Sequence, residues 1–150
     1  MTDEPLPERA HFPVRRPLQT RWMDNDHYGH VNNVAYYSFF DTAVNGFLIE
    51  ATGRDIRTDR AIGVVAETSC RFLKEISFPD ALEVGLAIER LGTRSVVYRL
   101  AIFRVDGAPC AIGRFVHVYV DRDTRQPVAI PGDIRAVLAP LAALTSGEAR

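Results

Sequence analysis

The fold is decided by residues 24–51, where a polar segment leads directly into a long apolar run: DNDHYGHVNN followed by VAYYSFFDTAVNGFLIEA. The second part, Val34–Ala51, contains one glycine and no proline, which is typical of a helix. Its apolar residues lie on more than one side of that helix, so we expect most of the helix to be buried. The helix should end near Gly53, because glycine is a usual C-terminal stop signal.

The second half of the chain changes to an alternation of apolar and other residues, which is typical of strands. Short turns such as Asp106-Gly107 separate long strands, so we expect antiparallel neighbours. A last short helix is expected around Ile134–Leu141, bent or ended at Pro140. These elements predict an α+β fold, an antiparallel sheet wrapped around one long central helix. The predicted strands are 18–23, 62–76, 82–89, 96–102 and 110–120.

Length and charge limit the possible classes of protein. The chain has 150 residues, which favours one domain, expected over residues 15–150 after a flexible N-terminal tail of residues 1–14. Eighteen basic and nineteen acidic side chains leave a net charge of −1, which argues against binding to nucleic acid or to an anionic membrane. No apolar run approaches the ~20 residues that a membrane-spanning helix needs.

The cysteines and the N-terminus indicate a reducing compartment. Cys70 and Cys110 are far apart and match no metal or redox spacing, so we expect both to be small core residues. The chain starts with acidic residues and prolines and lacks the order of a signal peptide, which favours a cytoplasmic location. The polar segment contains a pair of aspartates and a pair of histidines, but no third group of possible metal ligands occurs elsewhere in the sequence. We therefore expect neither a metal nor another cofactor.

Residues that can carry chemistry are concentrated in the polar segment before the helix. A helix start presents unpaired backbone N–H groups, which favour negative charge developing on a carbonyl oxygen under attack. Gly29 would let a carbonyl approach the backbone closely, and Asp26 or His30 could activate water or attack directly. The alternative interpretation is that Asn32 or Asn33 only caps the helix and the aspartates only shape a turn.

Residues 21–36, RWMDNDHYGHVNNVAY, resemble the D-x-D-x-x-G-H-V-N-N-x-x-Y signature of hotdog-fold acyl-CoA thioesterases. The resemblance is strongest to the 4-hydroxybenzoyl-CoA thioesterase-like family and extends over Val14–Leu144. It implies a hotdog fold and a hydrolase in which CoA belongs to the substrate. It also implies a homodimer or homotetramer, in which two domains join their sheets and build each active site at the shared boundary.

The resemblance also implies roles for single residues. It places the catalytic aspartate at Asp26, as nucleophile or general base, and the oxyanion donor at Gly29 or its neighbour His30. The segment is similar as well to plant acyl-carrier-protein thioesterases, in which a histidine four residues after the aspartate is functional. That position is His30 here, but Tyr28 replaces the asparagine that those enzymes have between the two, so their arrangement cannot be carried over whole.

Five residues are expected to contact the substrate. Asn32, Asn33 and Tyr28 belong to the polar segment itself. Arg94, at a turn beside Ser95, resembles a position at which relatives contact the phosphates of CoA, and a guanidinium can bind phosphate through two hydrogen bonds. The alternative is that Arg94 is an ordinary solvated turn residue.

We therefore expect an enzyme that hydrolyses a fatty or aromatic acyl-CoA to the free acid and CoA. One alternative is a hydratase or dehydratase acting on acyl-CoA or acyl carrier protein, although such enzymes carry Asn-Pro where Asn25 is followed by Asp26 here. Another is an acyl-CoA-binding module without activity. His117 alternates with Phe115 and Tyr119 along a strand, so we expect it to be packed or hydrogen-bonded rather than catalytic. The sequence leaves acyl length, aryl or alkyl preference and the carrier open.

Overall fold

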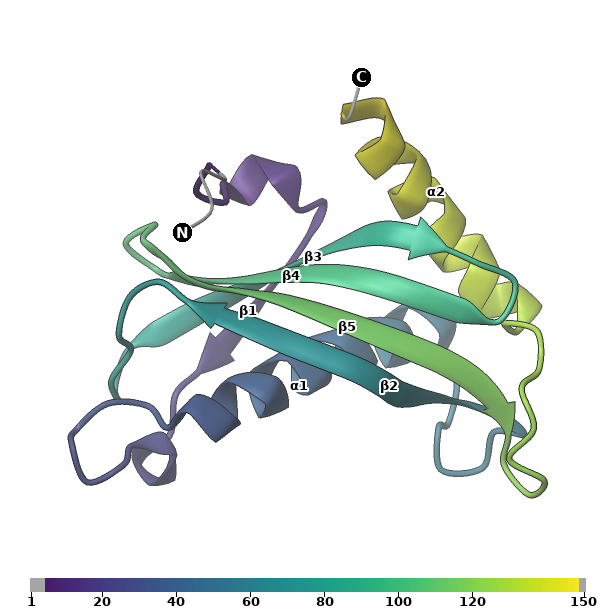
Figure 1. The fold of residues 1–150 in the computed structure, drawn as a ribbon, viewed down its shortest axis with the longest axis horizontal. Helices are drawn as coiled ribbons and strands as arrows, with labels where there is room; N and C mark the ends of the chain where they lie inside the picture. The colour runs from purple at the N-terminus through teal and green to yellow at the C-terminus, as the bar shows by residue number, and fades with distance from the viewer. Residues whose placement is uncertain (1–4, 149–150) are drawn as a thin grey trace.

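The computed structural model describes residues 5–148, which form a five-stranded antiparallel sheet with two α-helices (Figure 1). Two short 3-10 turns, Arg9–His11 and Trp22–Asp24, flank the first strand. This confirms the predicted α+β class. The elements are β1 (Val14–Gln19), α1 (Asn33–Thr52), β2 (Ala61–Phe72), β3 (Ala81–Leu91), β4 (Ser95–Arg104), β5 (Pro109–Asp121) and α2 (Gly132–Glu148).

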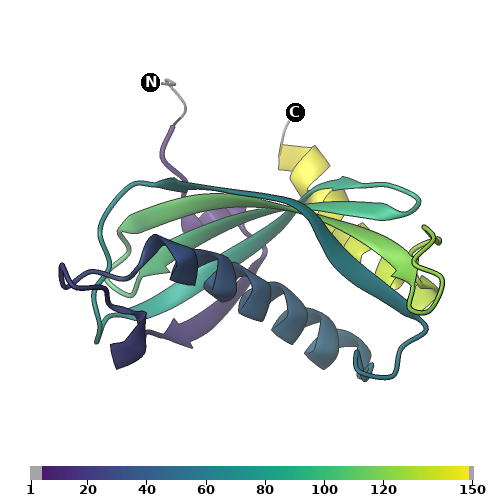
Figure 2. The same ribbon diagram turned by 60° about the horizontal axis from the view of Figure 1, so that its bottom comes forward.

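The strands lie in the order β1-β3-β4-β5-β2, so β2 is an edge strand that, within residues 5–148, pairs only with β5. α1 runs along one face of the curved sheet (Figure 2). α2 packs against β3, beside the turn that joins β3 to β4. We call the face that carries α1 the helix face. The register of β2 slips between Val65 and Glu67, and such a bulge increases the local twist of an edge strand.

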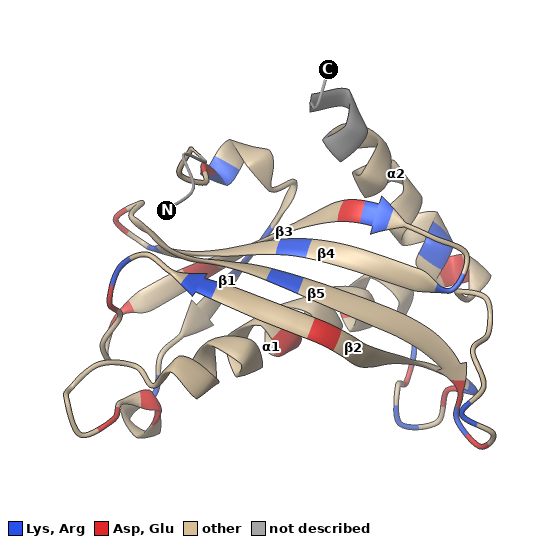
Figure 3. Cartoon of the chain, viewed as in Figure 1, with Lys and Arg blue, Asp and Glu red and all other residues tan. Residues whose placement is uncertain are grey.

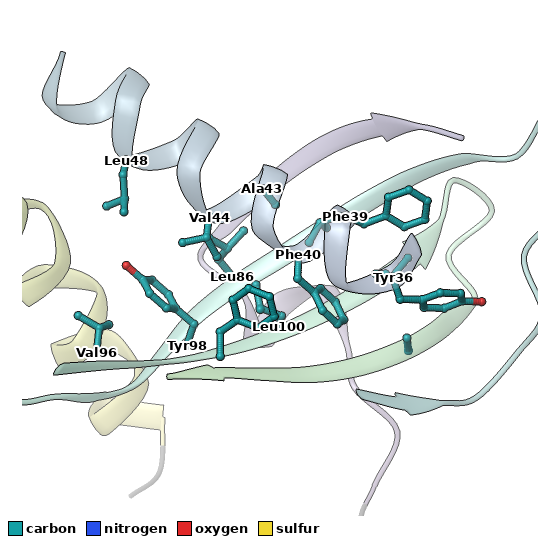
Figure 4. Close-up of a cluster of buried hydrophobic side chains, with 14 of the residues drawn as sticks. Tyr36, Phe39, Phe40, Ala43, Val44, Leu48, Leu86, Val96, Tyr98 and Leu100 are labelled. Carbon is teal, nitrogen blue, oxygen red and sulfur yellow. The ribbon is translucent and has the colours of Figure 1, made fainter. Parts of the chain in front are cut away.

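The main core lies between α1 and the helix face. Phe40 and Val44 of α1 are completely buried, and they meet the inward-facing residues of β3 and β4 (Figure 4). Because side chains in a strand alternate between faces, the period of two seen in the sequence directs one set of apolar residues to this core. The inward-facing residues of these two strands are Leu82, Val84, Leu86, Ile88, Val96, Tyr98, Leu100 and Ile102.

Residues 1–14 were expected to form a flexible tail; residues 1–4 lie outside the described residues, and the segment is packed against the sheet at Phe12. Phe12 is buried on the outer face of the sheet with Ala87, Ala101 and Phe103, and its ring meets Phe103 edge to face at 5.9 Å. Gly85 makes room for it, since a Cβ there would stand 2.7 Å from the Phe12 ring. The apolar burial of one aromatic side chain therefore fixes a segment that has no periodic pattern of its own.

Three predicted boundaries were wrong. The first strand covers Val14–Gln19 and not 18–23, because Arg21 and Asp24 bond to each other and turn the chain. β2 ends at Phe72, where the N–H groups of the next two residues both donate to the Cys110 carbonyl. α2 continues past Pro140 to Glu148, since Pro140 lies on the exposed side while the opposite side of the helix is buried.

Candidate active site

The polar segment before α1 forms a tight turn held by its own backbone. The N–H of Asp26 donates to the carbonyl of His30 at 2.9 Å, and the N–H of Gly29 donates back to the Asp26 carbonyl at 3.2 Å. The Asp26 carboxylate accepts the N–H of Tyr28 at 2.8 Å. Gly29 has a φ of 84°, a left-handed conformation that favours glycine. The turn therefore holds Asp26 and His30 together.

The segment between β2 and β3 anchors this turn from outside. The Val31 N–H donates to the Ile76 carbonyl, the Ser77 hydroxyl donates to the Gly29 carbonyl at 2.9 Å, and the Phe78 N–H donates to the Asn25 side chain. These bonds join residues about fifty positions apart in the sequence. The turn is consequently fixed to the sheet as well as to α1.

The start of α1 offers free backbone donors. Asn32 is the N-cap, because its side-chain oxygen accepts the Val34 N–H at 3.1 Å. Among the described residues, the N–H groups of His30 and Asn33 have no acceptor. The N–H of Gly29 is already used within the turn, so of the two oxyanion donors expected from the sequence, His30 is the one that is available.

Asp24 has a structural position. Its side chain is buried, accepts the backbone N–H of Arg21 at 2.7 Å and forms an ion pair with the Arg21 guanidinium at 2.8 Å. Its carbonyl also accepts the N–H of Asn32 at 2.8 Å. These bonds support the entry into the turn and leave Asp26 as the more accessible carboxylate of the pair.

A cavity of about 260 Å³ opens beside this turn, and we call it the front cavity. His30 lines it and its Nε2 lies 3.0 Å from a carboxylate oxygen of Glu75. No pattern in the sequence indicates Glu75, because it comes close to His30 only through the bond between Val31 and Ile76. The lining residues are His30, Val31, Asn33, Tyr36, Phe72, Leu73, Lys74 and Glu75.

The structure does not bring all the expected substrate-binding residues together within one chain. Tyr28 is 87% exposed and does not line the front cavity. Arg94 and Ser95 lie at the turn between β3 and β4, whereas Ser77, which bonds to the Asp26 turn, lies near the opposite end of β3. At ~3.4 Å per residue, the length of β3 separates the two ends by about 35 Å. Sequence patterns give no such distance.

Charge is distributed without a dominant sign. Lys and Arg residues are interleaved with Asp and Glu over the strands and loops seen in Figure 3. Over residues 5–148, no helix is long and apolar enough to cross a membrane. The same residues contain no group of three or more His, Cys, Asp or Glu side chains placed to hold a metal ion.

Comparison with known proteins gives a family and a fold. The model of the "Thioesterase-like superfamily" matches residues 20–138. The crystal structure of the PA5185 protein from Pseudomonas aeruginosa is 51% identical, with a TM-score of 0.87 over 91% of this chain and 96% of that one.

Two structures from Staphylococcus aureus share the fold at lower identity. One is a DHNA-CoA thioesterase, 20% identical with a TM-score of 0.80 over 91% of this chain and 94% of its own. The other is the hypothetical protein SAV2348 in complex with CoA, 18% identical with a TM-score of 0.79 over 86% and 83% of the two chains. At these identities the likeness concerns the fold.

Proposed function

Because the chain belongs to the thioesterase-like superfamily and has its hotdog fold, we propose that it hydrolyses the thioester of an acyl-CoA to a free acid and CoA. The observation that carries the proposal is the turn at the start of α1. It holds the Asp26 carboxylate, one imidazole and two backbone N–H groups without acceptors among the described residues. His30 and Asn33 of this segment line the front cavity, whereas Asp26 does not line it. Thioester hydrolysis requires a base or nucleophile and donors for the carbonyl oxygen.

In this proposal Asp26 acts on the thioester carbonyl, either by taking a proton from the attacking water or by direct attack. In the first case the oxygen of water bonds to the carbonyl carbon, the carbon–sulfur bond breaks, and the thiolate takes up the proton. In the second case a carboxylate oxygen of Asp26 bonds to the carbonyl carbon as the carbon–sulfur bond breaks and the thiolate leaves. Water then hydrolyses the resulting anhydride to the free acid and Asp26, and the proton released goes to the thiolate. The N–H groups of His30 and Asn33 hold the carbonyl oxygen as it becomes negative. The imidazole of His30, held by Glu75 at 3.0 Å, orients the substrate or the water.

The proposed working unit contains two copies of the chain. β2 is an edge strand, and its exposed residues Val65 and Phe72 are 46% and 47% accessible. Both side chains lie on the helix face of the sheet. Val65 pairs with His117 of β5, and the Phe72 ring packs against the Tyr36 ring of α1 with centroids 4.8 Å apart. An edge that leaves apolar side chains uncovered favours pairing with another strand.

Pairing two copies through β2 also explains the distant position of Arg94. A two-fold axis at the middle of β2 reverses the strand, so the Arg94 end of one copy lies near the Asp26 turn of the other. Arg94 of the second copy then binds phosphates of CoA. The CoA complex of the S. aureus protein with the same fold supports a CoA ligand for this fold.

The test is the release of free thiol from a panel of fatty and aromatic acyl-CoAs. We expect hydrolysis of at least one member, and we expect Asp26→Asn to lower kcat about 10²–10⁴-fold, as loss of a general base does. Asp123→Asn is the matched control, because Asp123 is an exposed aspartate that pairs with Arg60 beyond β5. Unchanged thiol release by Asp26→Asn would refute the assignment of Asp26.

The panel also separates the two alternatives. A hydratase or dehydratase alters the acyl chain and releases no thiol. A binding module retains acyl-CoA and releases neither product. Mass spectrometry of the reaction mixture distinguishes these outcomes from hydrolysis.

A further inference from the structure

Basic residues lie side by side on β4 and β5 (Figure 3), on the face of the sheet opposite α1, which we call the outer face. Arg99 of β4 pairs directly with Arg114 of β5. Their strand neighbours Tyr98 and Phe115 belong to the core beneath α1, so both arginine side chains point away from that core. Side chains directly opposite each other have Cβ atoms ~5 Å apart, and like charges in such a pair are destabilising. The pair therefore favours a negatively charged group nearby.

Among the described residues, the carboxylates of this face pair with Arg114 and leave Arg99 without a hydrogen-bond acceptor. The Nε of Arg114 lies 3.0 Å from a carboxylate oxygen of Glu89, and its Nη1 lies 3.5 Å from one of Glu67. Arg99 is exposed, and its guanidinium lies over the Phe12 ring, 6.0 Å from the ring centroid. A ring in this position attracts the charge but leaves the N–H groups in the guanidinium plane unbound. The donors of Arg99 are therefore available to a ligand.

Both arginines line an open depression of about 660 Å³, which we call the outer depression. This volume lies within the ~300–1,000 Å³ that is typical of small-molecule sites. Of its described lining residues, three are arginines and one is a glutamate, so positive charge is in excess. A negatively charged ligand therefore suits the depression better than a neutral one. The lining residues are Pro5, Ser69, Cys70, Arg71, Glu89, Arg99, Ile112, Gly113 and Arg114.

We propose that the outer depression binds a diphosphate group and that Arg99 and Arg114 hold it through hydrogen bonds from both guanidiniums. Each guanidinium presents a planar fork of N–H groups that matches two oxygens of a phosphate. The two forks start from neighbouring strands, ~4.8 Å apart, which suits two phosphates joined through one oxygen. The charge of the ligand then offsets the repulsion between the two arginines. Pyrophosphate, ADP and CoA all carry this group.

The outer depression is separate from the candidate active site. Among the described residues, it shares no lining residue with the front cavity. The sheet also lies between it and α1, and the Asp26 turn stands at the start of α1. The inference therefore goes beyond the proposed function and does not depend on it. If the protein hydrolyses acyl-CoA, both its substrate and its product CoA carry the diphosphate that this site binds.

The test is isothermal titration calorimetry at low ionic strength with pyrophosphate, ADP and CoA, and with adenosine as the uncharged control. Because Arg94 is also expected to contact phosphates, every protein in the series carries Arg94→Gln. We expect saturable binding of pyrophosphate that weakens with added salt, and no binding of adenosine. Arg99→Gln and Arg114→Gln should each raise the Kd for pyrophosphate by about tenfold or more, the effect of losing hydrogen bonds between charged groups. Tighter binding of ADP or CoA assigns the site to a nucleotide, and equal or weaker binding assigns it to free diphosphate.

Arg15→Gln is the matched control. Arg15 is an exposed arginine of β1 that pairs with Gly85 on the outer face and does not line the depression. The substitution removes one positive charge from the same face, so it should change the Kd for pyrophosphate by less than about twofold. Arg99→Lys keeps the charge but loses the planar fork, and it should weaken binding by an intermediate amount.

A second measurement keeps the test decisive if a variant fails to fold. Pyrophosphate is titrated into the ¹⁵N-labelled full chain, and the backbone amide signals are followed by NMR. Saturable shifts concentrated at Arg99 and Arg114 support the inference. Absence of saturable binding, a Kd unchanged in both test variants, or an equal rise of the Kd in Arg15→Gln overturns it. None of these measurements uses thiol release, so failure of the proposed function is recognised separately.

Discussion

Lowering the pH from 7 to 5 should destabilise this protein through one buried imidazole, that of His117. Burial lowers its pKa from the ordinary 6.5 to about 4, and the charge of Asp41 on α1 offsets the effect in part. Arg54, Asp59 and Arg122 line a cavity at the end of α1 together with His117. Unfolding exposes the imidazole and restores its ordinary pKa, so between pH 6.5 and pH 4 the unfolded chain binds more protons than the folded one.

The sign and the size follow from this difference. Stability rises with pH wherever the unfolded state binds more protons, so the free energy of unfolding should fall as the pH falls through this window. With pKa values of 6.5 and about 4, the loss from this group is about 2 kcal/mol between pH 7 and pH 5, and about 3 kcal/mol when the window is complete. These losses are large compared with the total free energy of unfolding of a typical protein, about 5–15 kcal/mol.

Urea denaturation at pH 7, 6 and 5, at one fixed protein concentration, measures the effect in the wild type and in His117→Phe. The wild type should lose about 2 kcal/mol more than the variant between pH 7 and pH 5, because every other group is the same in both proteins. Equal losses would refute the reasoning, since they would show that His117 titrates alike in the folded and unfolded chains.

Two further predictions concern packing and assembly. Gly113→Ala should cost about 1–3 kcal/mol of stability in urea denaturation, because a Cβ there would stand 2.4 Å from the Phe40 ring; Gly132→Ala, which meets nothing within 4 Å, should stay within about 0.5 kcal/mol. Val65→Lys places a charge on the free edge of β2 and should convert a dimer to monomers in analytical ultracentrifugation. The same substitution at Val105, an exposed residue between β4 and β5, should leave the dimer intact, and a monomeric wild type would contradict the pairing.

Much of the architecture was predictable because it follows from local periodicity. The proline-free run predicted α1, whose observed bounds, Asn33–Thr52, differ by one residue at each end. The alternation in 82–89 and 96–102 predicted which residues of β3 and β4 face the core. The limits of β1 and of α2 were missed because an ion pair and tertiary packing overrode local signals. Phe12 was missed for the same reason, since its partners lie more than seventy residues away.

The candidate site, too, was predictable from the sequence only in part. The sequence located the turn that contains Asp26 and His30, because its residues are contiguous and lie directly before a helix. It did not reveal that Glu75 reaches His30, or that Arg94 lies at the opposite end of the sheet. It also predicted that His117 is packed or hydrogen-bonded. Its burial confirms the packing, and only the three-dimensional structure shows that its Nε2 has no hydrogen-bond partner among the described residues.

The sequence by itself determined the α+β class, the helix that the sheet covers and the residues of the polar turn before α1, because each depends on neighbours along the chain. Tertiary structure alone decided which strand is left as an edge, where the cavities lie and which buried polar groups remain without partners. Those properties depend on contacts between residues far apart in sequence. His117 is an ordinary strand residue in the sequence, and it comes to lie beside Gly63 in the wall of a cavity only after β2 and β5 pair.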